Sequence, residues 1–447
     1  MADVLPALLV DLYELTMADA YRRDGMADRP ATFSLFVRSL PPGRGYLVAA
    51  GLDDCLAWLE GLSFGDEELA AVARLGVFDA GFLDWLGGVR FTGSVRAVPE
   101  GTVVFPSEPV LEVDAPLAEG QLAETFLLNQ VTLQTVIATK AARCRDAAGG
   151  RAVVDFSLRR THGVDAGMKV AKVAGLVGLD GTSNVAGADR YGVPASGTMA
   201  HSFVQAWGDE TEAFRAYARA FPDSAVLLVD TYDTARGVER AVEVALERRR
   251  DGGGIRGIRL DSGDLAMLAA DARQRLDAAG LEDVRIFASG GLDERSLARL
   301  VAAGAPIDGF GVGSTLGVSA DAPTVDTVYK LVAVDGRPVL KTSPGKASWP
   351  CPKQVWRAPG WTGDTVAGQD EPPPVDGAVP LLVDVMRDGA RTAAGRVGLA
   401  EANAHFEEGF SQLPAGVRRL DGPEPYPVAI SERLRAVARE ITSREVG

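Results

Sequence analysis

Two glycine-rich turns in the second half of the chain have the residue types that bind phosphate. Ser289-Gly290-Gly291 follows the apolar stretch Val284–Ala288, and a second turn, Gly-Val-Gly-Ser-Thr at 311–315, follows the next apolar stretch. Glycines at a strand end let backbone amides approach an anion, and the following helix adds its positive end. Each turn alone could be a plain tight connection, but two adjacent ones favour a phosphate cradle. Its candidate residues are Ser289, Gly290, Gly291, Gly313 and Ser314.

A third strand end carries one cation and one carboxylate. In Gly-Ile-Arg-Leu-Asp-Ser-Gly-Asp, residues 257–264, Arg259 and Asp261 are two residues apart and therefore lie on the same side of an extended strand. An arginine can bind a phosphate or a carboxylate in bidentate fashion, and an aspartate can hold ribose hydroxyls or a metal ion. The alternative is that the two side chains form a buried ion pair.

An aromatic ring beside an arginine occurs at a fourth strand end. Phe156 and Arg159 lie in the segment 155–163, and together they could stack on a flat ring and bind its carboxylate. Taken alone, the pattern is weak, because a phenylalanine such as Phe156 is more often part of the core and Arg160 is more often solvated.

His201 lies in a loop of small polar residues, 196–202, and is a candidate for nucleophilic or acid–base work. Asp230, at the end of the apolar stretch 225–229, is a possible carboxylate partner that fixes its tautomer. An ordinary hydrogen-bonded histidine is the alternative. We interpret His162 and His405 as surface or packing residues.

These polar groups require a scaffold that brings several strand ends together. Five stretches share the order apolar strand, polar turn, helix, and a sixth, Ile307–Thr315, follows them; the five are Ala152–Arg160, Gly192–His201, Ala225–Asp233, Gly257–Asp264 and Val284–Asp293. This series predicts an α/β barrel over residues 131–344, in which the strand ends share one face. Residues 1–130 predict an α+β domain instead, and residues 345–447 form a third, less regular segment.

Composition excludes several classes of function. A formal charge of −15 argues against a nucleic-acid partner, and the chain has no apolar run that could span a membrane. Three cysteines without metal-binding spacing suit a reducing compartment, and three histidines make a histidine-rich metal site improbable. The first residues lack the basic stretch of a signal peptide, so we expect a cytoplasmic protein.

Taken together, the motifs resemble the nicotinate phosphoribosyltransferase family. The resemblance runs from Asp11-Leu12-Tyr13-Glu14-Leu15-Thr16 to Lys353 and covers the segments 155–163, 180–184, 196–202, 259–264, 289–291 and 311–314. It implies the type II phosphoribosyltransferase fold, an irregular TIM-like α/β barrel with an α+β N-terminal domain and a C-terminal extension that packs back on it. It also implies a head-to-tail homodimer with shared active sites.

The implied reaction moves the phosphoribosyl group of phosphoribosyl pyrophosphate onto nicotinate and yields nicotinate mononucleotide and pyrophosphate in NAD salvage. By resemblance, ATP hydrolysis is coupled to it through phosphorylated His201, which Asp230 orients, and Mg²⁺ offsets the charge of the pyrophosphate. Asp261 is the implied contact of a ribose hydroxyl or of Mg²⁺. The implied substrate contacts are Asp11, Tyr13, Phe156, Arg159, Ser183, Arg259, Ser289, Gly290, Gly291, Gly313 and Ser314, with Phe156 and Tyr13 on the two faces of the pyridine.

Ser183 bears on substrate choice. Related nicotinamide-using enzymes carry an aspartate here, which would repel the carboxylate of nicotinate, whereas an uncharged serine can donate a hydrogen bond to it. The alternatives are a nicotinamide phosphoribosyltransferase and a catalytically silent phosphate-binding homologue. A different barrel enzyme acting on phosphorylated sugars would not account for the segment 11–16 or for the His201 loop.

Overall fold

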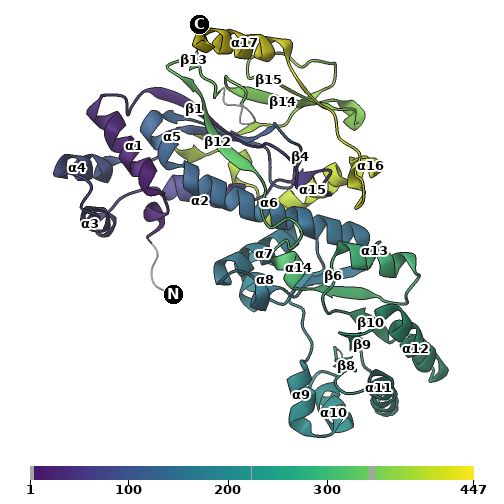
Figure 1. Cartoon of the computed structure of the whole chain (residues 1–447). Coiled ribbons are helices and arrows are strands. Elements are labelled where there is room, and N and C mark those ends of the chain that lie inside the picture. Colours follow the sequence, from purple (N-terminus) through teal and green to yellow (C-terminus); the bar gives the residue numbers. More distant parts are fainter. Residues whose placement is uncertain (1–4, 223, 342–347, 447) are drawn as a thin grey trace. The chain divides into compact units, whose positions relative to one another are not determined.

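The computed structural model describes residues 5–222, 224–341 and 348–446, without the side chains of the last two (Figure 1). Two predictions concern residues outside the described ones. They are the absence of a signal peptide, which rests on residues 1–4, and the domain boundary at 344/345. The chain forms two compact units, each described here by itself: unit 1 comprises 1–139 and 324–447, and unit 2 comprises 140–323. Within the described residues, no helix is both long and apolar enough to cross a bilayer.

Unit 1 contains a seven-stranded antiparallel sheet in the order β13-β12-β1-β5-β3-β17-β18. β1 (Pro30–Val37) lies between β12 (Thr327–Val334) and β5 (Pro109–Pro116). The remaining strands of this sheet are β3 (Ser94–Ala97), β13 (Arg337–Pro338), β17 (Val383–Arg387) and β18 (Ala390–Arg391). Because segments from both ends of the chain pair in it, the prediction that the C-terminal extension packs back on the N-terminal domain is confirmed.

Two smaller sheets complete the strands of unit 1, in the orders β16-β14-β15-β19 and β2-β4. Their strands are β2 (Leu47–Val48), β4 (Val103–Val104), β14 (Lys353–Arg357), β15 (Asp364–Gly368), β16 (Val379–Pro380) and β19 (Val428–Ile430). The longer helices are α1 (Leu12–Arg23), α2 (Leu52–Gly61), α3 (Asp66–Arg74), α4 (Ala80–Gly88), α5 (Leu117–Leu122), α6 (Glu124–Ala147), α15 (Leu399–Gln412) and α17 (Glu432–Val446). Helix α6 continues into unit 2, and Ala123 separates it from α5.

Unit 2 contains a six-stranded parallel sheet in the order β7-β6-β11-β10-β9-β8. Its strands are β6 (Ala152–Asp155), β7 (Gly181–Thr182), β8 (Val226–Leu228), β9 (Gly257–Leu260), β10 (Arg285–Ala288) and β11 (Gly309–Val312). Its helices are α7 (Val164–Leu176), α8 (Val185–Tyr191), α9 (His201–Trp207), α10 (Glu210–Ala220), α11 (Thr234–Arg250), α12 (Leu265–Ala278), α13 (Glu294–Ala302) and the short α14 (Ser314–Gly317). The mixed α/β class is confirmed, but β7 and β8 are edge strands, so closure into a barrel stays a prediction.

The strand expected within Gly192–His201 is wrong. Residues 196–200 are neither helix nor strand, and Ala195 makes only an isolated bridge to Thr182. Pro194 lacks an amide proton, and the glycines on either side of it, Gly192 and Gly197, disfavour an extended ladder. The sixth strand of the sheet is β7 instead.

Alternation of side chains along these strands sets up the site. Val153, Ile258 and Ile286 are buried in the interior of unit 2, and α7, α11 and α12 pack against the strands. The next residue along each of these strands faces the opposite side, where Val154, Arg259 and Phe287 line a cavity. The strand ends are therefore held by a buried apolar layer on one side of the sheet and are open on the other.

Candidate active site

The first glycine-rich turn is held against the neighbouring strand end. The amide of Ser289 donates to the carbonyl of Leu260 at 2.8 Å, and its hydroxyl donates to Asp261 Oδ1. Gly290 has φ of 92°, and a Cβ there would stand 1.8 Å from the carbonyl oxygen of Asp261, so only glycine fits. Gly290 and Gly291 are exposed, and no backbone group in the described part of the chain accepts their amides. Two open amides at a strand end are the donors that a phosphate needs.

The second turn repeats this pattern one strand along the sheet. Gly313 and Ser314 follow β11, and their amides likewise have no backbone acceptor among the residues that the structure describes. The hydroxyl of Thr315 donates to the carbonyl of Leu292, which ties the second turn to the first. The predicted phosphate-cradle residues therefore lie on two adjacent, linked turns.

Phe156 lies directly beside the second turn. Its amide donates to the carbonyl of Val312 at 2.8 Å, and a Cβ on Gly311 would stand 2.4 Å from its ring. The absence of a side chain at Gly311 thus lets the ring pack against the strand backbone. Phe156 is half-buried and lines the cavity, so part of the ring is available to a ligand.

Arg259 reaches from β9 toward both Phe156 and the His201 loop. Its guanidinium carbon is 5.9 Å from the centroid of the Phe156 ring. Nη1 donates to Thr198 Oγ1 at 2.5 Å, Nη2 donates to the carbonyl of Met199 at 3.0 Å, and the buried Nε has no partner in the described structure. Burial lowers the pKa of Arg259, and the nearby carboxylate of Asp261 opposes that effect. The alternative of a buried ion pair between Arg259 and Asp261 therefore does not hold, because these two side chains, both of which the structure describes, are not within salt-bridge distance of each other.

His201 is the first residue of α9 and faces two other strand ends. Its Nδ1 is 3.2 Å from Thr231 Oγ1, and its Nε2 is 4.0 Å from Asp261 Oδ2. Asp230, predicted to orient His201, instead accepts the amide of Asp261 at 2.9 Å and the hydroxyl of Ser262 at 2.7 Å, both at Oδ2. Among the described residues no hydrogen bond joins Asp230 to His201, and the adjacent Thr231 takes that place.

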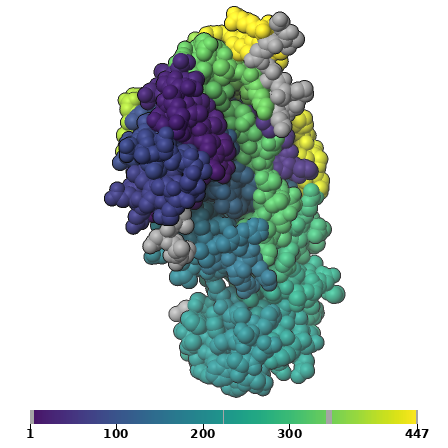
Figure 2. Space-filling view, turned by 60° about the vertical axis from the view of Figure 1, so that its left-hand side comes forward, coloured from purple at the N-terminus to yellow at the C-terminus, as the bar shows by residue number. Residues whose placement is uncertain are grey.

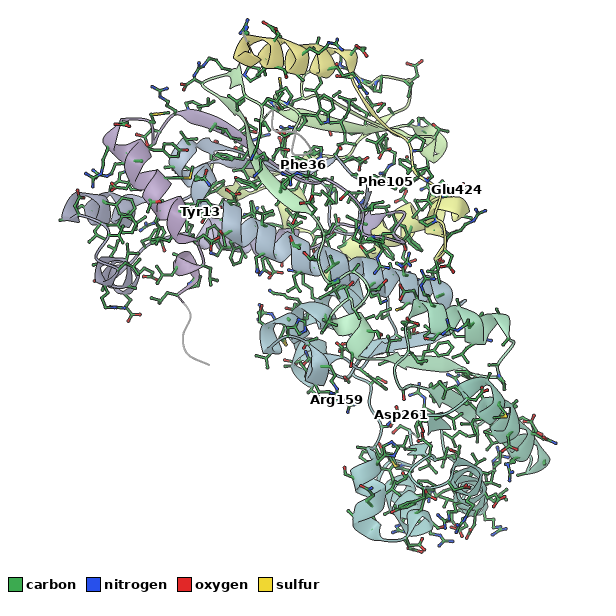
Figure 3. The ribbon with its side chains drawn as sticks, viewed as in Figure 1. Tyr13, Phe36, Phe105, Arg159, Asp261 and Glu424 are labelled. Atoms are coloured by element: carbon green, nitrogen blue, oxygen red, sulfur yellow. The ribbon has the colours of Figure 1, made fainter. Side chains whose placement is uncertain are left out.

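Ser183 and Arg159 come from the loops after β7 and β6. Ser183 is half-buried, and its amide donates to the carbonyl of Asp155 at 2.8 Å. Arg159 is exposed, and its positive charge contributes to the lowered pKa of Arg259, so the two cations lie within electrostatic reach. Figure 3 labels Arg159 and Asp261, which lie at the ends of different strands of unit 2.

A cavity of about 500 Å³ lies along the open face of the sheet and reaches Ala288 and Gly311, near the starts of the two glycine-rich turns. Its lining includes Phe156, Thr198, Tyr217, Arg259 and Phe287. Such a volume is typical of small-molecule sites, which combine apolar walls with a few polar groups. The cavity thus offers a flat aromatic wall and a cation beside the two turns that present open amides.

Asp11 and Tyr13 belong to unit 1, at the start of α1. Asp11 is the residue before the helix, and its amide donates to Glu14 Oε2 at 3.2 Å. Tyr13 is 44% exposed, and burial of the rest of the side chain together with Glu124 raises its pKa. Figure 2 shows the N-terminal helices, in purple and blue, at the surface of unit 1.

Thr198 and Thr231 are the polar contacts that the sequence did not single out. Thr198 lies inside the loop chosen for His201, and Thr231 directly follows Asp230. A hydroxyl beside a predicted catalytic residue is the only signal available, and threonine is too common at strand ends for it to be specific.

Comparison with known proteins identifies the family of the chain. Family models for the nicotinate phosphoribosyltransferase N-terminal domain, the family itself and its C-terminal domain match residues 8–132, 152–350 and 373–438. The chain is 51% identical to nicotinate phosphoribosyltransferase pncB2 of Mycobacterium tuberculosis, over 96% of this chain and 92% of the relative. It is 39% identical to nicotinate phosphoribosyltransferase of Bacillus subtilis, over 95% of this chain and 93% of the relative.

Among solved structures, human nicotinic acid phosphoribosyltransferase superposes with a TM-score of 0.86 at 32% identity, over 97% of this chain and all of that one. The high identity, the near-complete coverage and the three family models agree on one assignment. The chain therefore belongs to the nicotinate phosphoribosyltransferase family of enzymes.

Proposed function

We propose that this enzyme transfers the phosphoribosyl group of phosphoribosyl pyrophosphate to the ring nitrogen of nicotinate, in NAD salvage in the cytoplasm, and that it couples the transfer to ATP hydrolysis. The observation that carries the proposal is the placement of Arg259 over Phe156, beside two turns with open amides. An aromatic wall with a cation at its edge fits a planar ring that bears a carboxylate. The names of the relatives support the same substrate.

In the transfer step, the bond between the anomeric carbon and the pyrophosphate oxygen breaks, and a bond from the pyridine nitrogen to that carbon forms. The amides of Gly290, Gly291, Gly313 and Ser314 would hold the 5′-phosphate, and Phe156 would orient the pyridine. The anomeric carbon becomes cationic, so the carboxylate of Asp261 stabilises it or holds the ribose hydroxyls. Arg259, with Arg159 nearby, binds the nicotinate carboxylate.

His201 would be the nucleophile toward ATP. A ring nitrogen attacks the γ-phosphorus, the P–N bond forms as the P–O bond to ADP breaks, and water later removes the phosphoryl group. Nδ1 of His201 is hydrogen-bonded to Thr231, and the His201 side chain is 43% exposed. Nε2 is therefore the ring nitrogen that is open to a substrate. Asp230 supports this arrangement indirectly, because it fixes the backbone of Asp261.

The carboxylates fit a magnesium ion that arrives with the substrate phosphates. Within the described residues no three carboxylates, histidines or cysteines lie close enough to hold a metal ion by themselves. Mg²⁺ usually takes one or two protein carboxylates and completes its shell with phosphates and water. Asp261 is partly exposed, and Asp230 Oδ1 is buried without a hydrogen-bond partner among the described residues, so these two carboxylates would be the ones to hold the ion. When bound, Mg²⁺ offsets the charge of the departing pyrophosphate.

We further propose a head-to-tail homodimer in which Asp11 and Tyr13 of one copy complete the site of the other. The exposed positions of Leu12 and Tyr13, 50% and 44%, support this proposal. A tyrosine supplied in this way would cover the second face of the pyridine opposite Phe156.

The first test is steady-state turnover with nicotinate and with nicotinamide, each with phosphoribosyl pyrophosphate and Mg²⁺, with and without ATP. We expect a strong preference for nicotinate that ATP increases. His201→Ala should abolish ATP hydrolysis and leave some uncoupled transfer, whereas the exposed control His162→Ala should behave as the wild type. Preference for nicotinamide would reassign the substrate, turnover of neither would indicate a silent homologue, and full ATP-driven turnover in His201→Ala would refute the phosphohistidine.

A further inference from the structure

The guanidinium of Arg259 is shared between the pyridine subsite and the loop that carries His201. Both of its terminal nitrogens bind that loop, at the hydroxyl of Thr198 and at the carbonyl of Met199, 2.5 Å and 3.0 Å away. The same guanidinium lies 5.9 Å from the centroid of Phe156, the wall against which the pyridine would stack. One side chain therefore contacts both halves of the proposed reaction.

Besides Arg259, the loop 196–200 is restrained by the buried side chain of Met199 and by a 3.4 Å hydrogen bond from the Thr198 hydroxyl to the Met199 carbonyl. At its start, the amide of Ser196 donates to the carbonyl of Thr182 at 2.9 Å. At its end, Ala200 precedes α9 without a side-chain cap, and Gly197 has open space around it. Between these points, Arg259 binds the side-chain hydroxyl of Thr198 and the backbone carbonyl of Met199, two residues before His201. The position of the histidine thus depends on Arg259 as well as on the buried Met199.

A carboxylate at the edge of a pyridine stacked on Phe156 would compete with the loop for this arginine. Bidentate binding of a carboxylate uses two parallel N–H groups of the guanidinium fork. Thr198 and Met199 accept two of the five N–H groups, one on each Nη. A carboxylate bound end-on, across both Nη groups, would therefore weaken at least one bond to the loop.

We propose that Thr198 is a positioning residue through which the occupancy of the nicotinate carboxylate subsite controls the reactivity of His201 toward ATP. With the subsite empty, Arg259 holds the loop in the arrangement described above. A bound carboxylate draws the guanidinium away from Thr198 and frees the loop, which allows the ring of His201 to reach ATP. This inference rests on the proposed function, because it assigns Arg259 to nicotinate and His201 to ATP.

Thermodynamic reciprocity makes the proposal testable without turnover. If carboxylate binding weakens the contact between Arg259 and Thr198, then removal of that contact must strengthen carboxylate binding by the same factor. A merely structural role for Thr198 predicts the opposite, because a disordered loop would weaken binding. The sign of the change in affinity therefore separates the two explanations.

The probe is benzoate, which has the ring and the carboxylate of nicotinate but no ring nitrogen to accept the phosphoribosyl group, with benzamide as its uncharged counterpart. Isothermal titration calorimetry would compare the wild type, Thr198→Val, which keeps the shape but loses the hydroxyl, and Thr198→Ser, which keeps the hydroxyl. We expect Thr198→Val to bind benzoate about tenfold to a hundredfold more tightly than the wild type, as loss of one charge-assisted hydrogen bond implies. Thr198→Ser and all benzamide affinities should be unchanged. Equal or weaker benzoate binding by Thr198→Val would overturn the proposal.

ATP hydrolysis provides the second readout. In the wild type, benzoate should raise the rate of ADP formation and benzamide should not, whereas Thr198→Val should form ADP rapidly without either compound. A wild-type rate that ignores benzoate would contradict the link to His201. If the wild type hydrolyses no ATP at all, the phosphohistidine proposal fails, and the calorimetric comparison still decides whether Thr198 and a carboxylate compete for Arg259.

Discussion

The two units use buried charge in opposite ways. In unit 1, Arg357 donates to Asp364 from both Nε and Nη2, at 3.0 Å and 2.6 Å, and its guanidinium carbon is 4.0 Å from the centroid of the Trp361 ring. In unit 2, Arg259 binds only a hydroxyl and a carbonyl, and its Nε has no partner among the described residues. Figure 3 labels Phe105, whose ring also lies near the Arg357 guanidinium, and Asp261 of the open site.

This difference separates charges that hold the fold from charges that are available to a substrate. Arg357 and Asp364 are almost fully buried, and the chain itself supplies their partners. Arg259 and Asp261 stay half-exposed at strand ends and keep hydrogen-bonding capacity for a ligand. Substitutions in the first group should therefore change stability with little effect on substrate choice, and those in the second group should do the reverse.

The substitution with the largest expected effect, Gly290→Ala, should lower both stability and substrate binding, because it distorts the backbone of the phosphate cradle. Gly290→Ala places a Cβ 1.8 Å from the Asp261 carbonyl at a φ of 92°, so the turn must move. We expect a loss of at least about 3 kcal/mol in the free energy of unfolding and no measurable binding of phosphoribosyl pyrophosphate. Denaturant unfolding and calorimetry would measure the two quantities.

Gly304→Ala is the matched control for this substitution. Gly304 also has a positive φ, 65°, but open space surrounds it and it lies outside the phosphate cradle. It should cost about 1 kcal/mol and leave substrate binding unchanged. Equal effects of the two variants would show that strain at the glycine, and not the contact with Asp261, determines the result.

Arg357→Met tests the closed cluster of unit 1. The variant leaves the carboxylate of Asp364 buried without its cation, so we expect about 3–5 kcal/mol of destabilisation. At a temperature where the variant is folded, the KM for nicotinate should equal that of the wild type. The control is Arg433→Met, which removes a pair whose side chains are 60% and 70% exposed and should change stability by less than about 1 kcal/mol. A raised KM for nicotinate with unchanged thermal unfolding in Arg357→Met would contradict the assignment of Arg357 to the fold and not to the substrate.

Most of the elements could be predicted from local sequence signals. The apolar stretches at 152, 225, 257, 284 and 307 coincide with β6, β8, β9, β10 and β11, because alternation and turn chemistry act over a few residues.

The misses concern contacts that join residues far apart in the chain. β12 pairs with β1 across almost 300 positions of sequence, and no local pattern indicates that partner. The bonds from Arg259 to Thr198 and from His201 to Thr231 also form only when the strand ends meet. The division into 1–130, 131–344 and 345–447 stays a prediction, although β12, within the second range, belongs to the sheet of unit 1.

The first turn of α1 contains both kinds of residue: Tyr13 is exposed, whereas its neighbour Glu14 is fully buried. Burial raises the pKa of Glu14 to about 7, against hydrogen bonds from the amide and hydroxyl of Thr125 that lower it. The folded state thus holds the proton more tightly than the unfolded state. This contribution to stability is complete below pH 4.5 and disappears as the pH rises to about 7.

Glu14→Gln cannot ionise and should remove this pH dependence, a difference of at most about 3 kcal/mol across the range. Urea unfolding from pH 4.5 to 7 would measure the free energy of unfolding of each protein. The exposed Glu67→Gln is the control and should keep the slope of the wild type. If the free energy of unfolding of Glu14→Gln changed with pH as steeply as that of the wild type, a group other than Glu14 would be responsible for the pH dependence.

The smallest expected change concerns only which substrate the open site prefers. Ser183→Asp adds a carboxylate beside the proposed pyridine subsite, where it can accept the amide N–H of nicotinamide and repel the carboxylate of nicotinate. The effect is limited because residue 183 is partly exposed, so water screens the added charge, and because Arg259 and Arg159 still attract the carboxylate of nicotinate. We expect the ratio of nicotinamide to nicotinate kcat/KM to rise about tenfold, which corresponds to about 1.4 kcal/mol. Ser183→Asn has the size of aspartate without its charge, so it should leave the ratio nearly unchanged; an equal rise in both variants would assign the preference to shape, and no rise in either would remove Ser183 from substrate selection.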